Sequence, residues 1–187
     1  RMASKNALMR RLPSVEVLGS VNIICTDKTG TLTANAMTAR RMVSAHHQFH
    51  IHGEGYEPEG EIHGNDIDSS PQHTAILNQT ALVALLCNDS SIQAPDMQTP
   101  DWTVSGDPTE AALLVFALKQ GFVKQQSQRD WPRVDEIPFA SEARYMATLH
   151  HNHDGQQLMA VKGAPDRIIE FCDRQFGNQA PEPIDRA

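Results

Sequence analysis

The first long apolar stretch of the chain predicts a helix over residues 72–87. Its apolar side chains recur at the spacing that gathers them on one face of a helix, and these are Ile76, Leu77, Leu82, Val83, Leu85 and Leu86. Pro71 suits the first helical position, with Ser70 as the N-cap. We expect the apolar face, together with Cys87 at its end, to pack in a hydrophobic core.

A second helix is predicted to begin at Pro108 and to end at Gly121. Asp107 precedes it as the predicted N-cap, and Glu110 lies at the capping-box position. On that interpretation, the Glu110 side chain returns a hydrogen bond to the start of its own helix. A shorter helix is predicted over residues 165–171, where a proline again takes the first position.

Shorter apolar runs, separated by turn formers, predict strands. Residues 21–24 have the pattern of a buried strand that leads into a polar run from Cys25. Residues 90–101 are expected to be loop, and the proline-rich tail over residues 177–187 to be frayed. The other predicted strands are residues 37–43, 48–52, 102–105, 133–139, 145–150 and 157–161, with Asp154-Gly155 as the turn between the last two.

Composition indicates a globular protein, and the mixture of predicted strands and helices indicates an α/β fold of the α+β type. The 187 residues are 40% hydrophobic and 21% charged, which suits one domain with a core and a fragment of another. The elements predict a twisted antiparallel sheet flanked by helices.

A net charge of -7 argues against a nucleic-acid partner. Three cysteines without metal-like spacing suggest reduced thiols in a cytosolic compartment, and the nine histidines predict no metal site.

No stretch of the sequence predicts a membrane span or a signal peptide. The longest apolar runs, residues 81–87 and 111–118, are far shorter than the about 20 residues that a spanning helix needs. The N-terminus has no apolar stretch behind its basic residues. We therefore expect the chain itself to lie outside a bilayer.

The polar run over residues 25–33 has side chains that suit phosphate chemistry. Asp27 can act as a carboxylate nucleophile that forms an acyl-phosphate, and Lys28 supplies a point charge for phosphate oxygens. Gly30 lets the backbone approach a ligand, while hydroxyls such as that of Thr29 can orient the transferred group. An ordinary strand-to-loop turn, with Asp27 as a cap, is the alternative.

The sequence DKTGTLT, residues 27–33, resembles the phosphorylation motif of P-type cation-transporting ATPases. The resemblance implies that Asp27, with Lys28 and Thr29 beside it, accepts the γ-phosphate of ATP and is later hydrolysed to drive ion transport. It also implies a Mg²⁺ held by the Asp27 carboxylate and the Thr29 backbone carbonyl. Because such pumps move ions through membrane helices, the chain would be a cytoplasmic part of an integral (inner or plasma) membrane protein. Its partners would be the remaining phosphorylation, actuator and membrane domains.

Two later stretches resemble the nucleotide-binding domain of the same family. GEGYEPEGEI, residues 53–62, is similar to bacterial calcium-type members. GDPTEAALL, residues 106–114, resembles the family motif in which the glutamate, here Glu110, accepts a hydrogen bond from the adenine amino group. The alternative is that Glu110 only caps its helix. The implied organisation is the start of a phosphorylation domain over residues 1–33 and a nucleotide-binding domain over residues 34–187.

PFASEARYM and KGAPD complete the resemblance to a nucleotide pocket. It implies that Phe139 stacks on adenine, that Arg144 lies near the phosphates and that Met146 lines the pocket. It further implies that Lys162 lies at the bottom of the pocket and that Gly163 lets adenine approach the backbone. Taken one at a time, Phe139 and Met146 would also suit packing in a core. Arg144 and Lys162 would also suit solvated strand ends. Ser141 departs from the arginine that calcium pumps of animal type carry at that position.

The expected function is ATP binding within a cation pump, weak in this chain alone. The family completes its catalytic site with a later Gly-Asp-Gly-x-Asn-Asp stretch, which this sequence lacks, so turnover is not expected. One alternative is a soluble aspartate-nucleophile phosphatase of the haloacid dehalogenase-like class. Such enzymes usually place an acid two residues after the nucleophile, where this chain has Thr29. Another alternative is a stand-alone ATP-sensing module.

Overall fold

The computed structural model describes residues 20–28, 30–33, 36–64, 71–177 and 180–184. The chain divides into two compact units, residues 1–35 and residues 36–187. The assignment of residues 1–33 and 34–187 to a phosphorylation and a nucleotide-binding domain stays a prediction. Among the described residues, no helix has both the length and the apolar character needed to cross a bilayer.

In the smaller unit, the predicted buried strand over residues 21–24 does not form. Ile23 and Ile24 are 81% and 80% exposed, and no described strand pairs with this segment. A buried strand needs neighbouring strands to satisfy its backbone and layers to cover its side chains. Because the described strands supply neither, the prediction of a buried strand is wrong for this chain.

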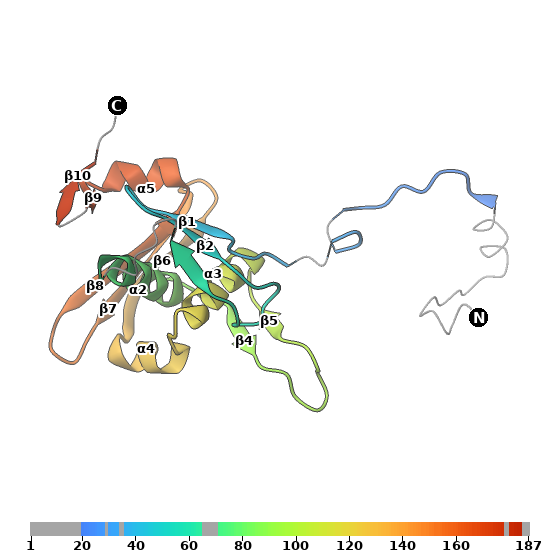
Figure 1. The fold of residues 1–187 in the computed structure, drawn as a ribbon, viewed down its shortest axis with the longest axis horizontal. Coiled ribbons are helices and arrows are strands. Elements are labelled where there is room, and N and C mark those ends of the chain that lie inside the picture. The colour runs from blue at the N-terminus through green and yellow to red at the C-terminus, as the bar shows by residue number, and fades with distance from the viewer. Residues whose placement is uncertain (1–19, 29, 34–35, 65–70, 178–179, 185–187) are drawn as a thin grey trace. The chain divides into compact units, whose positions relative to one another are not determined.

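The core of the larger unit forms around two packed helices. These are α2 (Pro71–Leu86) and α3 (Pro108–Lys119), which Figure 1 shows side by side in the middle of the unit. The predicted helix is confirmed, while its predicted N-cap, Ser70, lies outside the described residues. Leu82 and Val83 are only partly buried, and smaller alanines lie in the core instead. The fully buried side chains of this core include Ile76, Leu85, Cys87, Leu114 and Phe49.

A three-stranded antiparallel sheet forms the second layer and carries half of the pocket described below. Its strands are β6 (Arg133–Ala140), β7 (Tyr145–His151) and β8 (Gln157–Gly163), in the order β6-β7-β8. Met146 and Ala160 point from β7 and β8 into the core beside α2. The α5 helix (Pro165–Phe171) follows β8 at once, as the sequence predicts.

The remaining elements are short. Helix α4 (Lys124–Asp130) packs on α2, and the sequence analysis did not predict it. Two predictions of irregular structure are wrong in part, because β4 forms within residues 90–101, which are otherwise irregular, and β10 forms in the described part of the tail. Each of these strands gains an antiparallel neighbour that supplies its backbone hydrogen bonds. The short strands are β1 (Arg41–Val43), β2 (Gln48–Ile51), β3 (Ile62–Gly64), β4 (Ser91–Gln93), β5 (Thr103–Ser105), β9 (Arg174–Phe176) and β10 (Pro181–Pro183).

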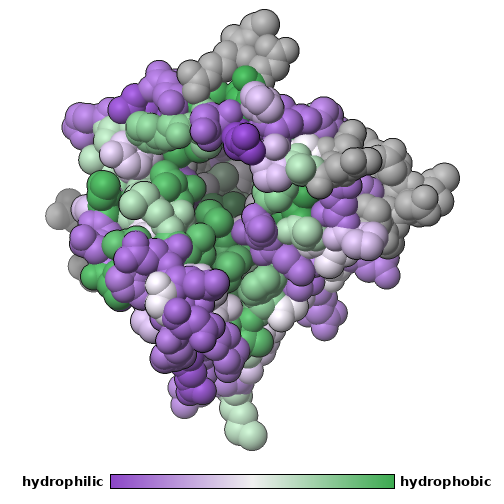
Figure 2. All heavy atoms as spheres, turned by 90° about the vertical axis from the view of Figure 1, so that its left-hand side faces the viewer, coloured by the Kyte–Doolittle hydropathy of each residue, from purple (hydrophilic) through white to green (hydrophobic). Residues whose placement is uncertain are grey.

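The described residues confirm the α+β class, with a difference in the sheet. Instead of one sheet, the ten strands among the described residues fall into four antiparallel sheets with the orders β1-β2-β3, β4-β5, β6-β7-β8 and β9-β10. Figure 2 views the side of the larger unit on which Figure 1 labels β8, α2 and the β9-β10 pair. Apolar side chains gather in the middle of this face, and polar side chains surround them.

Candidate functional site

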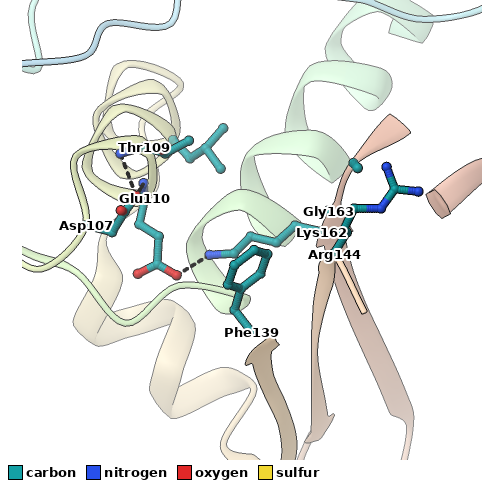
Figure 3. Close-up of a pocket in the computed structure, with 9 residues that line it drawn as sticks. Asp107, Thr109, Glu110, Phe139, Arg144, Lys162 and Gly163 are labelled. Atoms are coloured by element: carbon teal, nitrogen blue, oxygen red, sulfur yellow. Dashed lines mark hydrogen bonds and ion pairs between the residues drawn. The ribbon is translucent and has the colours of Figure 1, made fainter. Parts of the chain in front are cut away.

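One cavity of about 670 Å³ collects five of the six predicted nucleotide contacts. It lies between the start of α3 and the ends of β6 and β8 (Figure 3). A volume of this size is ordinary for a small-molecule site. The nine lining residues are Asp107, Thr109, Glu110, Leu113, Phe139, Arg144, Lys162, Gly163 and Ala164.

The start of α3 is capped by Asp107 alone. Its carboxylate accepts hydrogen bonds from the backbone N–H groups of Thr109 at 2.8 Å and Glu110 at 3.2 Å. Burial opposes ionisation of Asp107, but these hydrogen bonds and the charge of Lys162 outweigh it and lower the pKa of the carboxyl. Because Asp107 satisfies the helix start, the Glu110 side chain is available for other partners.

Glu110 does not form the capping box that was the alternative interpretation of its position. One of its carboxylate oxygens, Oε2, accepts from the backbone N–H groups of Asp89 at 3.0 Å and Ser90 at 3.1 Å, and from the Ser90 hydroxyl at 3.3 Å. The α3 helix therefore carries Glu110 toward the segment over residues 88–90, not back toward its own first turn. The carboxylate is anchored on the wall of the cavity.

The second oxygen of Glu110 pairs with Lys162 across the cavity. Lys162 donates to Oε1, and the two side chains are 20% and 16% exposed. Figure 3 shows Lys162 extending from the end of β8 toward Glu110 at the start of α3. The ion pair therefore joins the helical and sheet walls of the cavity.

The segment over residues 88–90, which the sequence analysis left without a role, is itself held in place. Arg133 donates to the Leu86 carbonyl at 3.0 Å and to the Asp89 carboxylate at 2.7 Å. The Asn88 side chain donates to the Glu110 carbonyl at 2.7 Å, and the half-buried Lys124 donates to the Ser90 carbonyl. Burial lowers the pKa of Lys124, and the charge of Arg133 lowers it further. No sequence motif predicts this support, because it depends on contacts between elements that are far apart in the sequence.

Phe139 and Met146 have opposite environments, although the sequence suggests pocket contacts for both. Phe139 lies near the end of β6, the edge strand, and is 61% exposed, so its ring is available to a ligand. Met146 is 1% exposed and belongs to the hydrophobic core. It is not among the residues that line the cavity, so the structure places it behind the wall and not in contact with the interior.

Gly163 is required by the sheet itself. A side-chain Cβ at this position would lie 2.4 Å from the carbonyl oxygen of Arg144 and 2.7 Å from the Cα of Tyr145. Both neighbours are backbone atoms of β7 or the turn before it, which cannot move aside cheaply. The glycine lines the cavity, but close packing of β7 and β8 explains it without a ligand.

Arg144 lines the cavity with its charge already paired. Its guanidinium donates to the Asp166 carboxylate at 2.7 Å and 3.4 Å. Figure 3 shows the Arg144 side chain directed away from Glu110 and Lys162. Among the described lining residues, both cations are therefore engaged by carboxylates.

The polar run around Asp27 forms an exposed turn in the smaller unit. The Asp27 carboxylate accepts from the backbone N–H of Lys28 at 2.7 Å. The Lys28 carbonyl accepts from the backbone N–H groups of Leu32 and Thr33, and Gly30 has a φ of 72° that suits the tight turn. The predicted contributions of Thr29 lie outside the described residues.

Of the two residues implied as magnesium ligands, the structure describes only Asp27. The exposed Asp27 carboxylate has the oxygen chemistry that Mg²⁺ prefers, so this residue fits a metal ligand. One carboxylate does not complete a site, however. Within the described part of the chain, no cluster of three or more histidine, cysteine, aspartate or glutamate side chains could hold a metal ion.

Comparison with known proteins identifies relatives along the whole chain. It is 41% identical over 178 residues to the cation-transporting ATPase pma1 of Synechocystis sp., covering 92% of this chain and 19% of the relative. It is 39% identical over 188 residues to the probable cation-transporting ATPase F of Mycobacterium tuberculosis, covering 100% and 20%. It is 37% identical over 176 residues to the calcium-transporting ATPase of Bacillus subtilis, covering 94% and 19%. The chain thus spans about a fifth of the length of these relatives.

A family model also matches the larger unit. The model describes the cytoplasmic domain N of P-type ATPases, and the match covers residues 76–187. This range includes both helical and sheet walls of the cavity. The chain therefore belongs to the P-type ATPase family, and residues 76–187 match the family's model of the cytoplasmic domain N.

Proposed function

We propose that the chain is the ATP-binding cytoplasmic part of a cation pump. In the whole protein, ATP hydrolysis would pass through phosphorylated Asp27 and drive cation transport across a membrane. The proposal is supported by the names of the relatives, which are cation-transporting and calcium-transporting ATPases, and by the DKTGTLT run. The calcium-transporting relative from Bacillus subtilis favours a calcium-type cation as cargo.

The observation that carries the proposal is the joint exposure of Phe139 and Glu110 to one cavity. The Phe139 ring offers an aromatic face on which a base can stack, worth about 1–3 kcal/mol. Oε1 of Glu110 has one donor, Lys162, and retains the capacity to accept a second. An exocyclic amine such as that of adenine supplies that donor, whereas a keto oxygen at the same place would be repelled.

The same geometry predicts weak binding, with the base held better than the phosphates. Lys162 is paired with Glu110 and Arg144 with Asp166, so a phosphate chain must displace a carboxylate to reach either cation. Stacking, one hydrogen bond and a screened ionic contact, set against the entropy of association, give about -4 kcal/mol, or a Kd near 1 mM. Gly163 and Ala164 supply the backbone wall beside the base.

A calorimetric titration tests this proposal. We expect saturable binding of adenosine and of ATP, each near millimolar, and a loss of about tenfold in Phe139→Ala because the stacking surface is removed. Val134→Ala is the matched control, since Val134 is an exposed apolar residue on the same strand but outside the cavity lining. No saturation at ten times the expected Kd, or equal losses in both variants, would contradict the proposal.

The phosphorylation chemistry is proposed for the whole protein and not for this chain alone. Asp27 would be the nucleophile, Lys28 would attract phosphate oxygens, and Thr29 would contribute a carbonyl. Mg²⁺, when bound, would neutralise phosphate charge at Asp27 and Thr29. Incubation of the chain with γ-labelled ATP should leave Asp27 unlabelled. Label on Asp27 would contradict the proposal that phosphorylation requires the whole protein.

The remaining partners follow from the same proposal. The phosphorylation, actuator and membrane domains would be supplied by the rest of the protein, which would place this chain on the cytoplasmic side of the inner or plasma membrane. A net charge of -7 gives no basis for a nucleic-acid partner.

A further inference from the structure

Asp166 lies beside the cavity and is joined to it through one side chain. It follows β8 within the KGAPD stretch, in the first turn of α5. Its carboxylate receives both hydrogen bonds of the Arg144 guanidinium, at 2.7 Å and 3.4 Å. Asp166 itself is not among the residues that line the cavity, whereas Arg144 is. The pair therefore has one member inside the cavity and one outside.

The backbone of Arg144 is fixed, so only its side chain can change partner. Its φ of 59° is in the left-handed region, which is unusual for a residue other than glycine. Its N–H donates to the Ala140 carbonyl at 2.8 Å, and its carbonyl accepts from Ala164 N–H at 2.9 Å. These two hydrogen bonds hold the turn between β6 and β7 against the end of β8. The guanidinium is consequently attached to a rigid point at the rim of the cavity.

The ion pair itself is exposed and weak enough to exchange. The Arg144 and Asp166 side chains are 52% and 65% exposed. Pairs of this exposure contribute little, because water and salt screen both charges. A triphosphate presents several negative oxygens in the bidentate geometry that a guanidinium prefers. It can therefore compete with one carboxylate for Arg144.

We propose that Asp166 is a specificity-determining residue, which holds the Arg144 side chain away from the cavity. Only a ligand that carries a phosphate chain can displace Asp166 from Arg144. The inference rests on the proposed function, because it needs the base to be bound in the cavity first. Asp166 thereby lowers the affinity for nucleotides relative to nucleosides. The base supplies most of the binding free energy, and the phosphates gain a cation only by displacing Asp166.

Titration of wild type and Asp166→Asn with ATP and with adenosine tests the inference. Removing the competing charge should raise ATP affinity about two- to fivefold and leave adenosine affinity unchanged. Asp154→Asn is the matched control, because it removes the same charge from the exposed turn between β7 and β8. In an Arg144→Gln background, which keeps a long polar side chain at the left-handed position, Asp166→Asn should have no effect on ATP.

A second readout follows the Asp166 carboxyl directly by ¹³C NMR. In the free protein, hydrogen bonds from Arg144 hold the pKa of Asp166 below its usual range. Saturating ATP should raise that pKa in wild type but not in Arg144→Gln, and adenosine should leave it unchanged. A residue with only a structural role in α5 would show no such dependence on the phosphate chain.

The outcomes separate the inference from the proposed function. If adenosine binds and Asp166→Asn changes ATP and adenosine affinity equally, or changes neither, the inference is wrong and the proposed function stands. If neither ligand binds wild type, the proposed function is wrong and the inference falls with it. A selective gain for ATP that persists in Arg144→Gln would also overturn the inference, since Arg144 would not be the exchanged partner.

Discussion

Glu110 is the residue through which most of the site is connected. Its carboxylate accepts from Asp89, Ser90 and Lys162, and so joins the end of α2, the start of α3 and the end of β8. A carboxylate with this many donors is held in one orientation. The remaining capacity of Oε1 is therefore presented to the cavity in a fixed direction, which is what recognition of an amino group requires.

Replacing Glu110 by alanine should destabilise the protein as well as weaken binding. It would leave the N–H groups of Asp89 and Ser90 without this acceptor and Lys162 without its counter-charge. We expect a loss of about 2–3 kcal/mol in the free energy of unfolding. Urea denaturation measures it, with Glu142→Ala as the control at an exposed glutamate. A loss no larger than that of the control would contradict the described network.

The helix cap at Asp107 predicts a dependence on pH. Because its pKa is lowered in the folded state, Asp107 stabilises the protein fully above the ordinary carboxyl pKa, and the contribution is lost as pH falls through the folded value. Asp107→Ala should cost about 1 kcal/mol of unfolding free energy at pH 7 and less near pH 3, which is below the ordinary carboxyl pKa. Denaturation at both pH values tests this, and an equal cost at each would contradict the cap.

At the scale of elements, the approach of β8 to β7 depends on Gly163. A methyl group there would meet backbone atoms at 2.4 Å and 2.7 Å, so the strands must separate. Gly163→Ala should lower the free energy of unfolding by about 2 kcal/mol. Gly64→Ala is the matched control in another strand, because an added Cβ would make only ordinary contacts at 3.6 Å. Similar effects of the two substitutions would show that close packing does not explain Gly163.

Sequence reasoning succeeded for elements whose signals are local. Helix α3 follows from Asp107 and Pro108 at its start, and the β7-β8 hairpin from Asp154-Gly155 at its turn. It failed where structure depends on distant partners. Residues 21–24 have no neighbouring strand in the part of the chain that the structure describes, whereas β10, in a proline-rich tail, forms because β9 lies opposite.

The same difference between local signals and distant contacts applies to the site. The resemblance of the motifs to a nucleotide pocket predicted that Phe139, Glu110, Arg144 and Lys162 lie together, and all four line one cavity. It did not show that Glu110 pairs with Lys162 or Arg144 with Asp166, because each pairing depends on a contact between residues that are 52 and 22 positions apart in the chain. It also assigned the buried Met146 to the cavity, since an apolar residue on a strand suits either face of a sheet.

At the scale of the whole molecule, the chain has two units with different chemistry. The larger unit, residues 36–187, contains the cavity, and the smaller unit, residues 1–35, contains Asp27. On the proposed function, base recognition would belong to the larger unit and phosphoryl acceptance to the smaller unit. Affinity for the base should therefore depend on the larger unit, while the phosphorylation step requires further parts of the whole protein.

Intermolecular NOEs between adenosine and the protein test the central claim most directly. We predict that, at adenosine concentrations near 10 mM, the H2 and H8 protons of the base show NOEs to the Phe139 ring and to the Hα protons of Gly163. Phe139→Ala should remove the first set and weaken the second. Saturable adenosine binding with NOEs only to residues outside the cavity, or no binding at that concentration, would contradict the account.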